Sequence, residues 1–364
     1  MTQAAIVDVA ESRDPSASLV AELWRSVTPS AEEIRRARRR LHLKALAIAA
    51  LVAASYWALV LSSLPVLVRL GAGAVLVHGL AAVGTSIMHD ANHQAFSRHR
   101  WLNRLLGYTS DALGASSWLW RIQHNTLHHA NANVVGHDAD IALAPFARLA
   151  PSQPWRPWYR AQHIYMWPLY GFLALKNLLV SDLVAIITGR LDRQPLRQPR
   201  TPRVVLRITL GKLGHLAWAV VIPLMFNSWW AVLACYLVCS WLVGFILAIV
   251  FQLAHCVDVT TMHDDGTTPR RGDDFAMHQL QTTADIESRI PVIGHVFRFL
   301  VGGLDHQIEH HLGPRLPHTM YRRTAEQFRA KCRAHGITYH LHPGVWSALR
   351  SHTRWLRSMS IRPV

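Results

Sequence analysis

The sequence predicts an all-α integral membrane protein in which four transmembrane helices form two hairpins capped by a cytoplasmic helical domain. Of its 364 residues, 51% are hydrophobic. Arg69 is the only charged side chain between Ala45 and His89, and no Asp, Glu, Lys or Arg occurs between Leu213 and Val257. With a rise of ~1.5 Å per residue and a hydrocarbon thickness of ~30 Å, each run is long enough for about two membrane crossings.

Helix-breaking residues near the middle of each apolar run predict the two hairpin turns. They are Ser62-Ser63-Leu64-Pro65 in the first run and Asn227-Ser228 in the second. The alternative is a pair of buried helices in a soluble core, but soluble cores rarely need apolar runs of this length.

The distribution of basic residues predicts the orientation. Lys and Arg are frequent before the first hairpin, between the hairpins and in the C-terminal tail, whereas the two turns contain only Arg69. By the positive-inside rule, the N-terminus, the middle segment and the tail are expected to be cytoplasmic. Because the first forty residues are polar and lack an apolar core, no cleavable signal is expected. The formal charge of +16 is then explained by anionic lipid headgroups, and no motif supports nucleic-acid binding.

We expect one integrated domain over residues 1–364. Its expected parts are a polar lead-in (1–43), a first hairpin (44–88), a first cytoplasmic block (89–203), a second hairpin (204–257) and a second cytoplasmic block (258–364) with a polar loop at 264–274. Ser30 and Glu33 form a capping-box pattern that starts a basic helix.

The apolar stretch 163–189 is interrupted by Pro168, Lys176 and Asp182, which favours helices on the membrane surface or under the cap. The four cysteines form no C-x-x-C pair, so neither a disulfide framework nor an iron–sulfur cluster is indicated.

Histidines four residues apart share one face of an α-helix and are expected to reach the same metal. Three such pairs occur: His89/His93, His124/His128 and His306/His310. The adjacent His129 and His311 are rotated away and are expected to address a second metal. His255, at the end of the fourth predicted span, should lie at the same membrane depth as His89.

Eight or more imidazole nitrogens are too many ligands for one ion, so the pattern favours two metals. Imidazole-rich sites with open positions suit iron that must meet oxygen. A structural zinc is usually closed by four ligands, often cysteines, which these spacings do not offer. For any one histidine pair the alternative is surface or capping chemistry, and this reading suffices for His78, His215 and His318.

Polar side chains beside these histidines are expected to orient the imidazoles, since metal-bound histidines usually donate their other N–H to a carboxylate or carbonyl. Arg121 and Asn125 could orient such carboxylates. For each of these groups the alternative is a solvated surface charge. The expected carboxylates are Asp90, Asp138, Asp140, Asp305 and Glu309.

The motifs "HDANH", "HNTLHH" and "QIEHHL" around two membrane hairpins resemble the three histidine boxes of the membrane fatty acid desaturases. The resemblance runs from about residue 45 to the end. The segment "GGLDHQIEHHLGPRLPH" is especially similar to the front-end and bacterial linoleoyl-CoA desaturase branch, which has Gln where Gln307 stands. Membership would imply two irons, O2 as co-substrate, two electrons from a redox partner and an acyl chain in a tunnel. The expected location is the plasma membrane of a bacterium.

The resemblance also implies which residues bind the irons. Carried over position by position, the ligands are His89, His93, His124, His128, His129, His310 and His311. His255 matches an additional histidine after the fourth span, Gln307 or His306 completes the set, and His278 is a further candidate.

Two features depart from the front-end pattern. Relatives often carry a fused cytochrome b5 domain with an H-P-G-G motif, but only "HPGV" occurs here, at 342–345. The expected electron donor is therefore a separate protein such as ferredoxin, flavodoxin or cytochrome b5, whose acidic surface would suit a basic cytoplasmic face.

The second departure is Gly313, which replaces a common Phe and is expected to widen the space near the site. Trp118, Trp120 and Tyr170 are candidates for the tunnel wall or, alternatively, for membrane-interface aromatics.

The sequence leaves open whether the acyl chain is carried by CoA, acyl carrier protein or a glycerolipid. A hydroxylase or acetylenase could use the same di-iron site. A metal transporter is the more distant alternative, but it would need polar ligands inside the spans, where only His78 and His215 stand out.

Overall fold

The computed structural model describes residues 15–191, 194–264, 273–287 and 290–363. The described chain is mostly helical, and its strands form short two-stranded pairs. The antiparallel pair joins β1 (Arg190–Leu191) to β2 (Gln194–Pro195), and the parallel pair joins β3 (Asp285–Ile286) to β4 (Leu341–His342). Most of the predicted loop 264–274 lies outside the described residues.

In the described part of the chain, four helices are long and apolar enough to cross a membrane, as the sequence predicts. Their turns fall at residues 62–65 and 225–228, which coincide with the predicted breakers. The spans are Ala31–Leu61 (α2, Ala31–Tyr56, and η1, Trp57–Leu61), Val66–Asn92 (α3, Val66–Ala82; η2, Val83–Met88; α4, His89–Asn92), Pro202–Leu224 (α11, Pro202–Leu216; η7, Ala217–Val221; α12, Ile222–Leu224) and Trp229–His255 (α13).

Helix α2 begins where the capping box predicts. The Ser30 hydroxyl accepts a hydrogen bond from the Glu33 backbone N–H, and the Ser30 N–H donates to the Glu33 carboxylate at 2.9 Å. The helix then runs without a break from its basic first turns into the apolar segment. The expected boundary at residue 43 therefore falls inside one helix.

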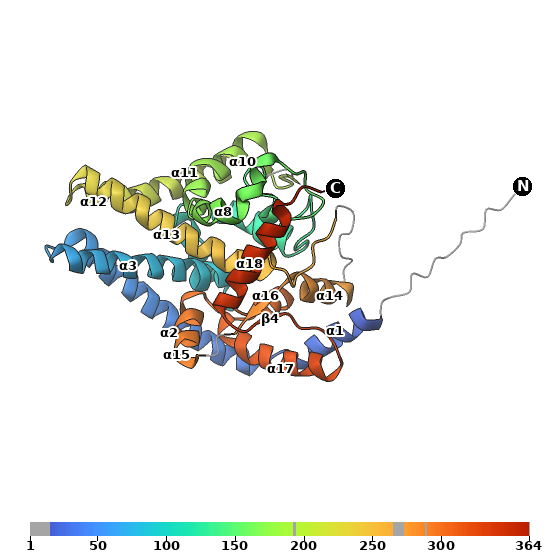
Figure 1. Cartoon of the computed structure of the whole chain (residues 1–364). Helices are drawn as coiled ribbons and strands as arrows, with labels where there is room; N and C mark the ends of the chain where they lie inside the picture. Colours follow the sequence, from blue (N-terminus) through green and yellow to red (C-terminus); the bar gives the residue numbers. More distant parts are fainter. Residues whose placement is uncertain (1–14, 192–193, 265–272, 288–289, 364) are drawn as a thin grey trace, which may run out of the picture.

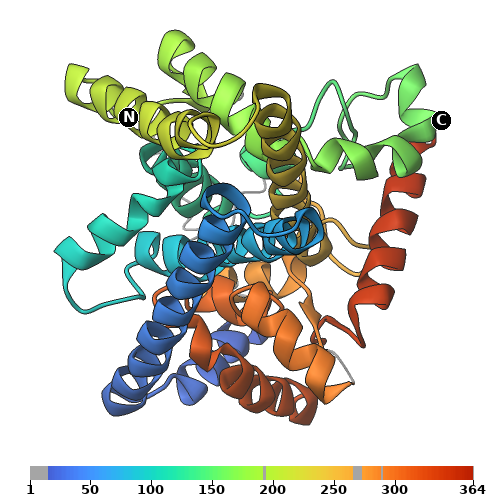
Figure 2. The same ribbon diagram turned by 90° about the vertical axis from the view of Figure 1, so that its left-hand side faces the viewer.

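Most of the other helices form a cap over one end of the four-helix bundle, opposite the hairpin tips (Figure 1). In the view from the tips, α18 lies beside the green segment that contains α8, whereas α17 lies on the side of α2 (Figure 2). The helices before the second hairpin are α1 (Pro15–Val27), α5 (Arg100–Gly107), α6 (Thr109–Ala112), α7 (Ser117–Trp120), η3 (Arg121–His128), η4 (Ala139–Ile141), η5 (Pro157–Ala161), α8 (Gln162–Tyr170), α9 (Leu173–Lys176), η6 (Asn177–Ser181) and α10 (Asp182–Thr188). Those after it are α14 (Asp273–Thr282), α15 (Pro291–Leu300), α16 (Gln307–Leu312), η8 (His318–Met320), α17 (Tyr321–Ala334) and α18 (Val345–Ser360).

The apolar stretch after residue 157 forms two helical arms with a 76° bend between Tyr170 and Leu173. By length and composition this bent pair could be a broken span or a re-entrant segment. At the bend, Gly171 lies directly against the indole of Trp241, which donates a hydrogen bond to the Pro168 carbonyl at 3.1 Å. The bend is therefore packed tightly against the fourth span.

Gly244 of α13 is expected to be essential for this close packing. A Cβ at this position would overlap the Gly171 carbonyl oxygen and lie 2.9 Å from the Ala174 nitrogen. Because the obstacle is backbone, Gly244→Val should lower the free energy of unfolding by about 1–3 kcal/mol or more. Thermal unfolding of the detergent-solubilised protein measures the loss. Gly214→Val, where a Cβ has nothing within 4 Å, is the matched control, and equal unfolding of both variants would contradict this account of the packing.

Candidate metal centre

Two spans end in buried histidines at the capped end of the bundle. His89 lies in the last turn of the second span, and His255 is the final residue of α13. The helix ends thus bring two imidazoles to the boundary between the bundle and its cap.

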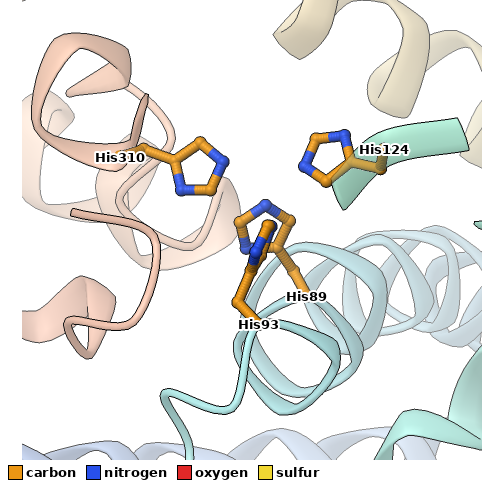
Figure 3. A group of neighbouring side chains, drawn as sticks. All are labelled: His89, His93, His124 and His310. Atoms are coloured by element: carbon orange, nitrogen blue, oxygen red, sulfur yellow. The ribbon is translucent and has the colours of Figure 1, made fainter. Parts of the chain in front are cut away.

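A first group of imidazoles comprises His89, His93, His124 and His310. One ring nitrogen from each lies within 4.8 Å of the others. Figure 3 shows the four rings around a common space, with His89 and His93 from one helix end, His124 from a neighbouring segment and His310 from the opposite side. The expectation that His89 and His93 share one site therefore agrees with the geometry.

A second group lies beside the first and comprises His128, His255 and His311. The Nε2 atoms of His128 and His311 are 3.2 Å apart. His129 lies at the boundary, because it groups with His310 and His311 while its Nε2 is 3.3 Å from Nε2 of His124. All eight principal histidines of the sequence analysis are therefore brought together in two adjacent groups.

Four of these imidazoles are fixed from outside through Nδ1, which directs Nε2 inward. Their Nδ1 atoms lie 3.1 Å from Asp138 Oδ2 (His128), 3.2 Å from the Thr282 carbonyl (His255), 3.1 Å from the Tyr321 hydroxyl (His310) and 2.7 Å from Gln279 Oε1 (His311). A cluster that served only to fill the core would not need one nitrogen of each ring to be left facing the others.

Several inward nitrogens have no hydrogen-bond partner among the described residues, although they are buried. They are Nε2 of His89, His93, His255 and His310, and Nδ1 of His129. Leaving a buried polar atom unsatisfied costs about 1–3 kcal/mol. Metal ions would satisfy these atoms, so the residues fit a metal centre made of imidazoles.

The protonation states also favour metal binding. Burial, together with neighbouring histidines, holds the pKa values of His93, His124, His129, His310 and His311 well below the usual value. These rings are therefore neutral, which is the form that binds a metal.

The segment that carries His124 and His128 does not follow the four-residue spacing rule. Residues 121–128 form a π-helix, and the His129 N–H donates to the His124 carbonyl five residues earlier. One turn of a π-helix contains more residues than one turn of an α-helix. His124 and His129 consequently lie one turn apart and in contact, while His128 faces His255 and His311, although His124 and His128 can also converge with Asp140.

The expected carboxylates fall into two sets. Asp138 contacts His128, and Asp140 lies 3.7 Å from the same Nδ1. Asp90 lies 3.6 Å from His89 Nδ1 and accepts hydrogen bonds from the backbone and ring of His318. These three surround the groups.

The other expected polar residues contact different partners. Asp305 accepts a hydrogen bond from Arg298, and Glu309 accepts one from the Tyr339 hydroxyl at 3.0 Å. Arg121 and Asn125 do not orient carboxylates: both donate to Asn92, Arg121 to its side chain and Asn125 to its carbonyl, each at 3.0 Å.

The remaining ligand candidates lie elsewhere. His306 groups with Asp285 and Glu309, and its Nδ1 is 3.2 Å from Asp285. Nε2 of His278 lies 2.9 Å from the Ala132 carbonyl oxygen, and its ring is tilted against that of His263 with 4.9 Å between the ring centroids. Gln307 is buried at the first residue of α16.

The tunnel candidates differ in their surroundings. The Trp120 ring lies 4.4 Å from that of His124, beside the first imidazole group. Trp118 packs in an apolar cluster with Leu119 and Ile122, and the Tyr170 hydroxyl contacts His352 at 2.8 Å. At Gly313 the space of a Cβ is already filled by Trp24 and Leu316, so this glycine permits close packing and does not widen the site.

A cavity of about 840 Å³ lies between the two hairpins. Its wall is mostly apolar and includes Leu80, Leu113, Leu178 and Val243, and it reaches Arg69 near the hairpin turns. None of the four tunnel candidates lines it. Its size and apolar wall suit a hydrocarbon chain.

Sequence reasoning missed Gln279, Tyr321, Thr282 and His318, which hold the histidines or the Asp90 carboxylate in place. Gln279, Tyr321 and His318 act through uncharged side chains, and Thr282 acts through its backbone carbonyl. Gln279 had a nearby signal, because it follows His278 directly. His318 closes the segment "GGLDHQIEHHLGPRLPH", but the surface or capping interpretation given to it is wrong, since it is buried against Asp90.

Gln279→Leu should weaken metal binding. The change removes the acceptor for His311 Nδ1 and the donor to the His129 carbonyl. Losing such a partner typically lowers metal affinity about 10–100-fold. Metal content after dialysis against a graded chelator series measures this, with Gln281→Leu on the exposed side of the same helix as control. Identical retention by the two variants would contradict the assigned role.

Chelator-treated protein should lose stability in acid. The five depressed histidine pKa values mean that the unfolded chain takes up protons as the pH falls through about 6.5, while the folded chain does not. The free energy of unfolding should thus be level above that pH and decrease below it. Burial lowers the pKa of His128, but Asp138 and Asp140 outweigh burial and raise it, which offsets part of the effect. Thermal midpoints between pH 8 and 5.5 test this, and a pH-independent midpoint would refute it.

Comparison with known proteins identifies the family of the chain. The family model described as "Fatty acid desaturase" matches residues 64–343. The chain is 31% identical to an sn-1 linoleoyl-lipid 6-desaturase of Arthrospira platensis over 290 residues, which cover 79% of this chain and 77% of the relative. A Synechocystis sn-1 linoleoyl-lipid 6-desaturase is 34% identical over 315 residues, 84% of each chain. An acyl-lipid (8-3)-desaturase of Physcomitrium patens is 35% identical over 326 residues, 88% of this chain and 66% of the relative. The chain therefore belongs to the fatty acid desaturase family, and it is an oxidoreductase that desaturates fatty acyl chains.

Proposed function

We propose that this protein uses two irons to introduce a double bond near the carboxyl end of an acyl chain carried by a membrane glycerolipid. The observation that carries the proposal is the pair of adjacent imidazole groups with unpartnered inward nitrogens. The lipid carrier and the position near the carboxyl end rest on the relatives, which are named for acyl-lipid 6- and (8-3)-desaturation.

In this proposal one iron is held by His89, His93, His124 and His310. The other iron is held by His128, His255 and His311, and His129 lies between the two groups. When bound, the irons would supply the oxidising power by which O2, two electrons and two protons remove one hydrogen from each of two adjacent methylenes, giving a double bond and two waters. The geometry favours iron over a closed structural zinc, because the donors are imidazoles only and outnumber four.

The chain itself positions the reactants. Asp138, Gln279 and Tyr321 fix imidazoles from outside, and Trp120 covers His124. The buried setting keeps bulk water away from the reacting methylenes. The apolar cavity between the hairpins would hold the methyl end of the chain, so that chain length and depth select the carbons that react.

We infer that the centre faces the cytoplasm of a bacterial cell and receives electrons from a separate acidic protein such as ferredoxin, flavodoxin or cytochrome b5. The support is the positive-inside rule, since the basic first turns of α2 lie at the end of the span opposite the hairpin turn. A basic face would attract an acidic donor through long-range electrostatics.

Expression in a host of known lipid composition tests the proposed function. We expect a new fatty acid two mass units lighter than its precursor, by gas chromatography–mass spectrometry, with a double bond near the carboxyl end. His124→Ala should abolish this product because it removes a central nitrogen, whereas His78→Ala, an exposed histidine in the second span, should retain it. A product sixteen mass units heavier would instead identify a hydroxylase, and a further loss of two hydrogens from an existing double bond would identify an acetylenase. Unaltered activity of the His124→Ala variant would contradict the assignment of the metal centre.

A further inference from the structure

A second cavity, of about 370 Å³, lies outside the imidazole groups and is lined by four arginines. Arg100 and Arg104 come from α5, Arg121 begins η3, and Arg207 lies near the start of the third span. Tyr108 and Asn103 add polar atoms to the wall. The volume lies within the range of ~300–1,000 Å³ that is typical of ligand pockets.

The charges of this arginine pocket are not balanced by the protein. Among the described residues, no carboxylate forms an ion pair with any of the four guanidinium groups within 4.0 Å. Asp111 is near Arg121, but it also accepts a hydrogen bond from the Ser117 N–H. Burial, and then repulsion from Arg104 and Arg207, lowers the pKa of Arg121, while Tyr108 and Asp111 act in the opposite sense. An anion in the pocket would relieve this repulsion.

The pocket shares a wall with the metal centre. Arg121 donates to the Asn92 side chain, and Asn92 directly precedes His93. Arg121 also begins the segment that carries His124. An anion held by these arginines would thus be separated from the first imidazole group by little more than one layer of side chains.

The pocket also lies at the level expected for lipid headgroups. Arg207 is in the second turn of α11, at the capped end of the third span, and the hairpin turns are at the other end. Basic side chains at the end of a span are suited to the phosphate layer of a membrane.

We propose that the arginine pocket binds the phosphate of the substrate's carrier and so places the carboxyl end of the acyl chain beside the metal centre. This inference rests on the proposed function. Guanidinium groups bind phosphate oxygens through paired, charge-assisted hydrogen bonds, and several of them fix both position and orientation. A phosphate held so close to the first imidazole group leaves room for only a short stretch of acyl chain before the irons, which suits desaturation near the carboxyl end. The phosphate could belong to a glycerophospholipid or to CoA. A neutral galactolipid has no phosphate and would form none of these charge-assisted hydrogen bonds.

The test compares the full-length protein with the double variant Arg104→Gln/Arg207→Gln, which leaves Arg121 and its bond to Asn92 in place. The control is Arg98→Gln, an exposed arginine just before α5 that does not line the pocket. Binding is measured on detergent-purified protein with three probes: dilinoleoyl phosphatidylglycerol, linoleoyl-CoA and dilinoleoyl monogalactosyldiacylglycerol. Iron content and thermal unfolding verify that each variant is folded and loaded.

We expect the double variant to bind a phosphate-bearing probe about tenfold more weakly, and the galactolipid unchanged, since each charge-assisted bond lost is worth about that factor or more. Added salt should weaken wild-type binding of the same probe. A loss confined to phosphatidylglycerol identifies a phospholipid carrier, a loss confined to linoleoyl-CoA identifies CoA, and a loss of both supports phosphate recognition by either source.

Turnover gives an independent readout. With the phosphate-bearing substrate, KM should rise about tenfold while kcat changes little, because the arginines hold the carrier and do not touch the reacting carbons. Equal binding of all three probes by wild type and double variant, or an equal loss for the galactolipid, would overturn the proposal. If no carrier is desaturated by the wild type, the proposed function fails, but the binding comparison still decides whether this pocket recognises phosphate.

Discussion

The structure depends on the burial of imidazole nitrogens that the protein itself does not satisfy. Removing these atoms from water costs free energy, and no described side chain faces them with a compensating hydrogen bond. Outward partners such as Asp138 and Gln279 fix the rings so that they cannot turn away from one another. The cost is offset only when cations occupy the space between the rings, so metal binding and the packing of the cap are coupled.

The main features of the fold could be predicted because they follow from one physical term, the transfer of apolar surface into a membrane. The four spans and the turns at 62–65 and 225–228 required only the apolar runs and their breakers. The capping box located the start of α2, but no sequence signal showed that this helix continues through residue 43 into the span. The bend after Tyr170 also escaped prediction, since it depends on Trp241 and Gly244 of a distant helix.

The histidines of the metal centre were predictable as a set, whereas their division between two groups was not. The spacing argument assumed α-helical geometry, but residues 121–128 form a π-helix, which brings His124 against His129. A π-helical turn is stabilised by its tertiary surroundings and has no pattern of its own in the sequence. Charged partners were easier to anticipate than neutral ones: Asp138 was expected, while Tyr321 and the Thr282 carbonyl carry no signal that distinguishes them from other residues of their type.

Asn92 separates two electrostatic environments that would interfere with each other if they were in direct contact. On one side the imidazoles must be neutral to bind metal, and on the other the guanidinium groups remain charged at any physiological pH. The Asn92 amide oxygen accepts from Arg121 without adding a charge, and its carbonyl accepts from Asn125. An aspartate here would neutralise Arg121, and its negative charge would raise the pKa of the adjacent His93. A neutral amide therefore allows a permanently cationic pocket and a neutral metal-binding cluster to share one wall.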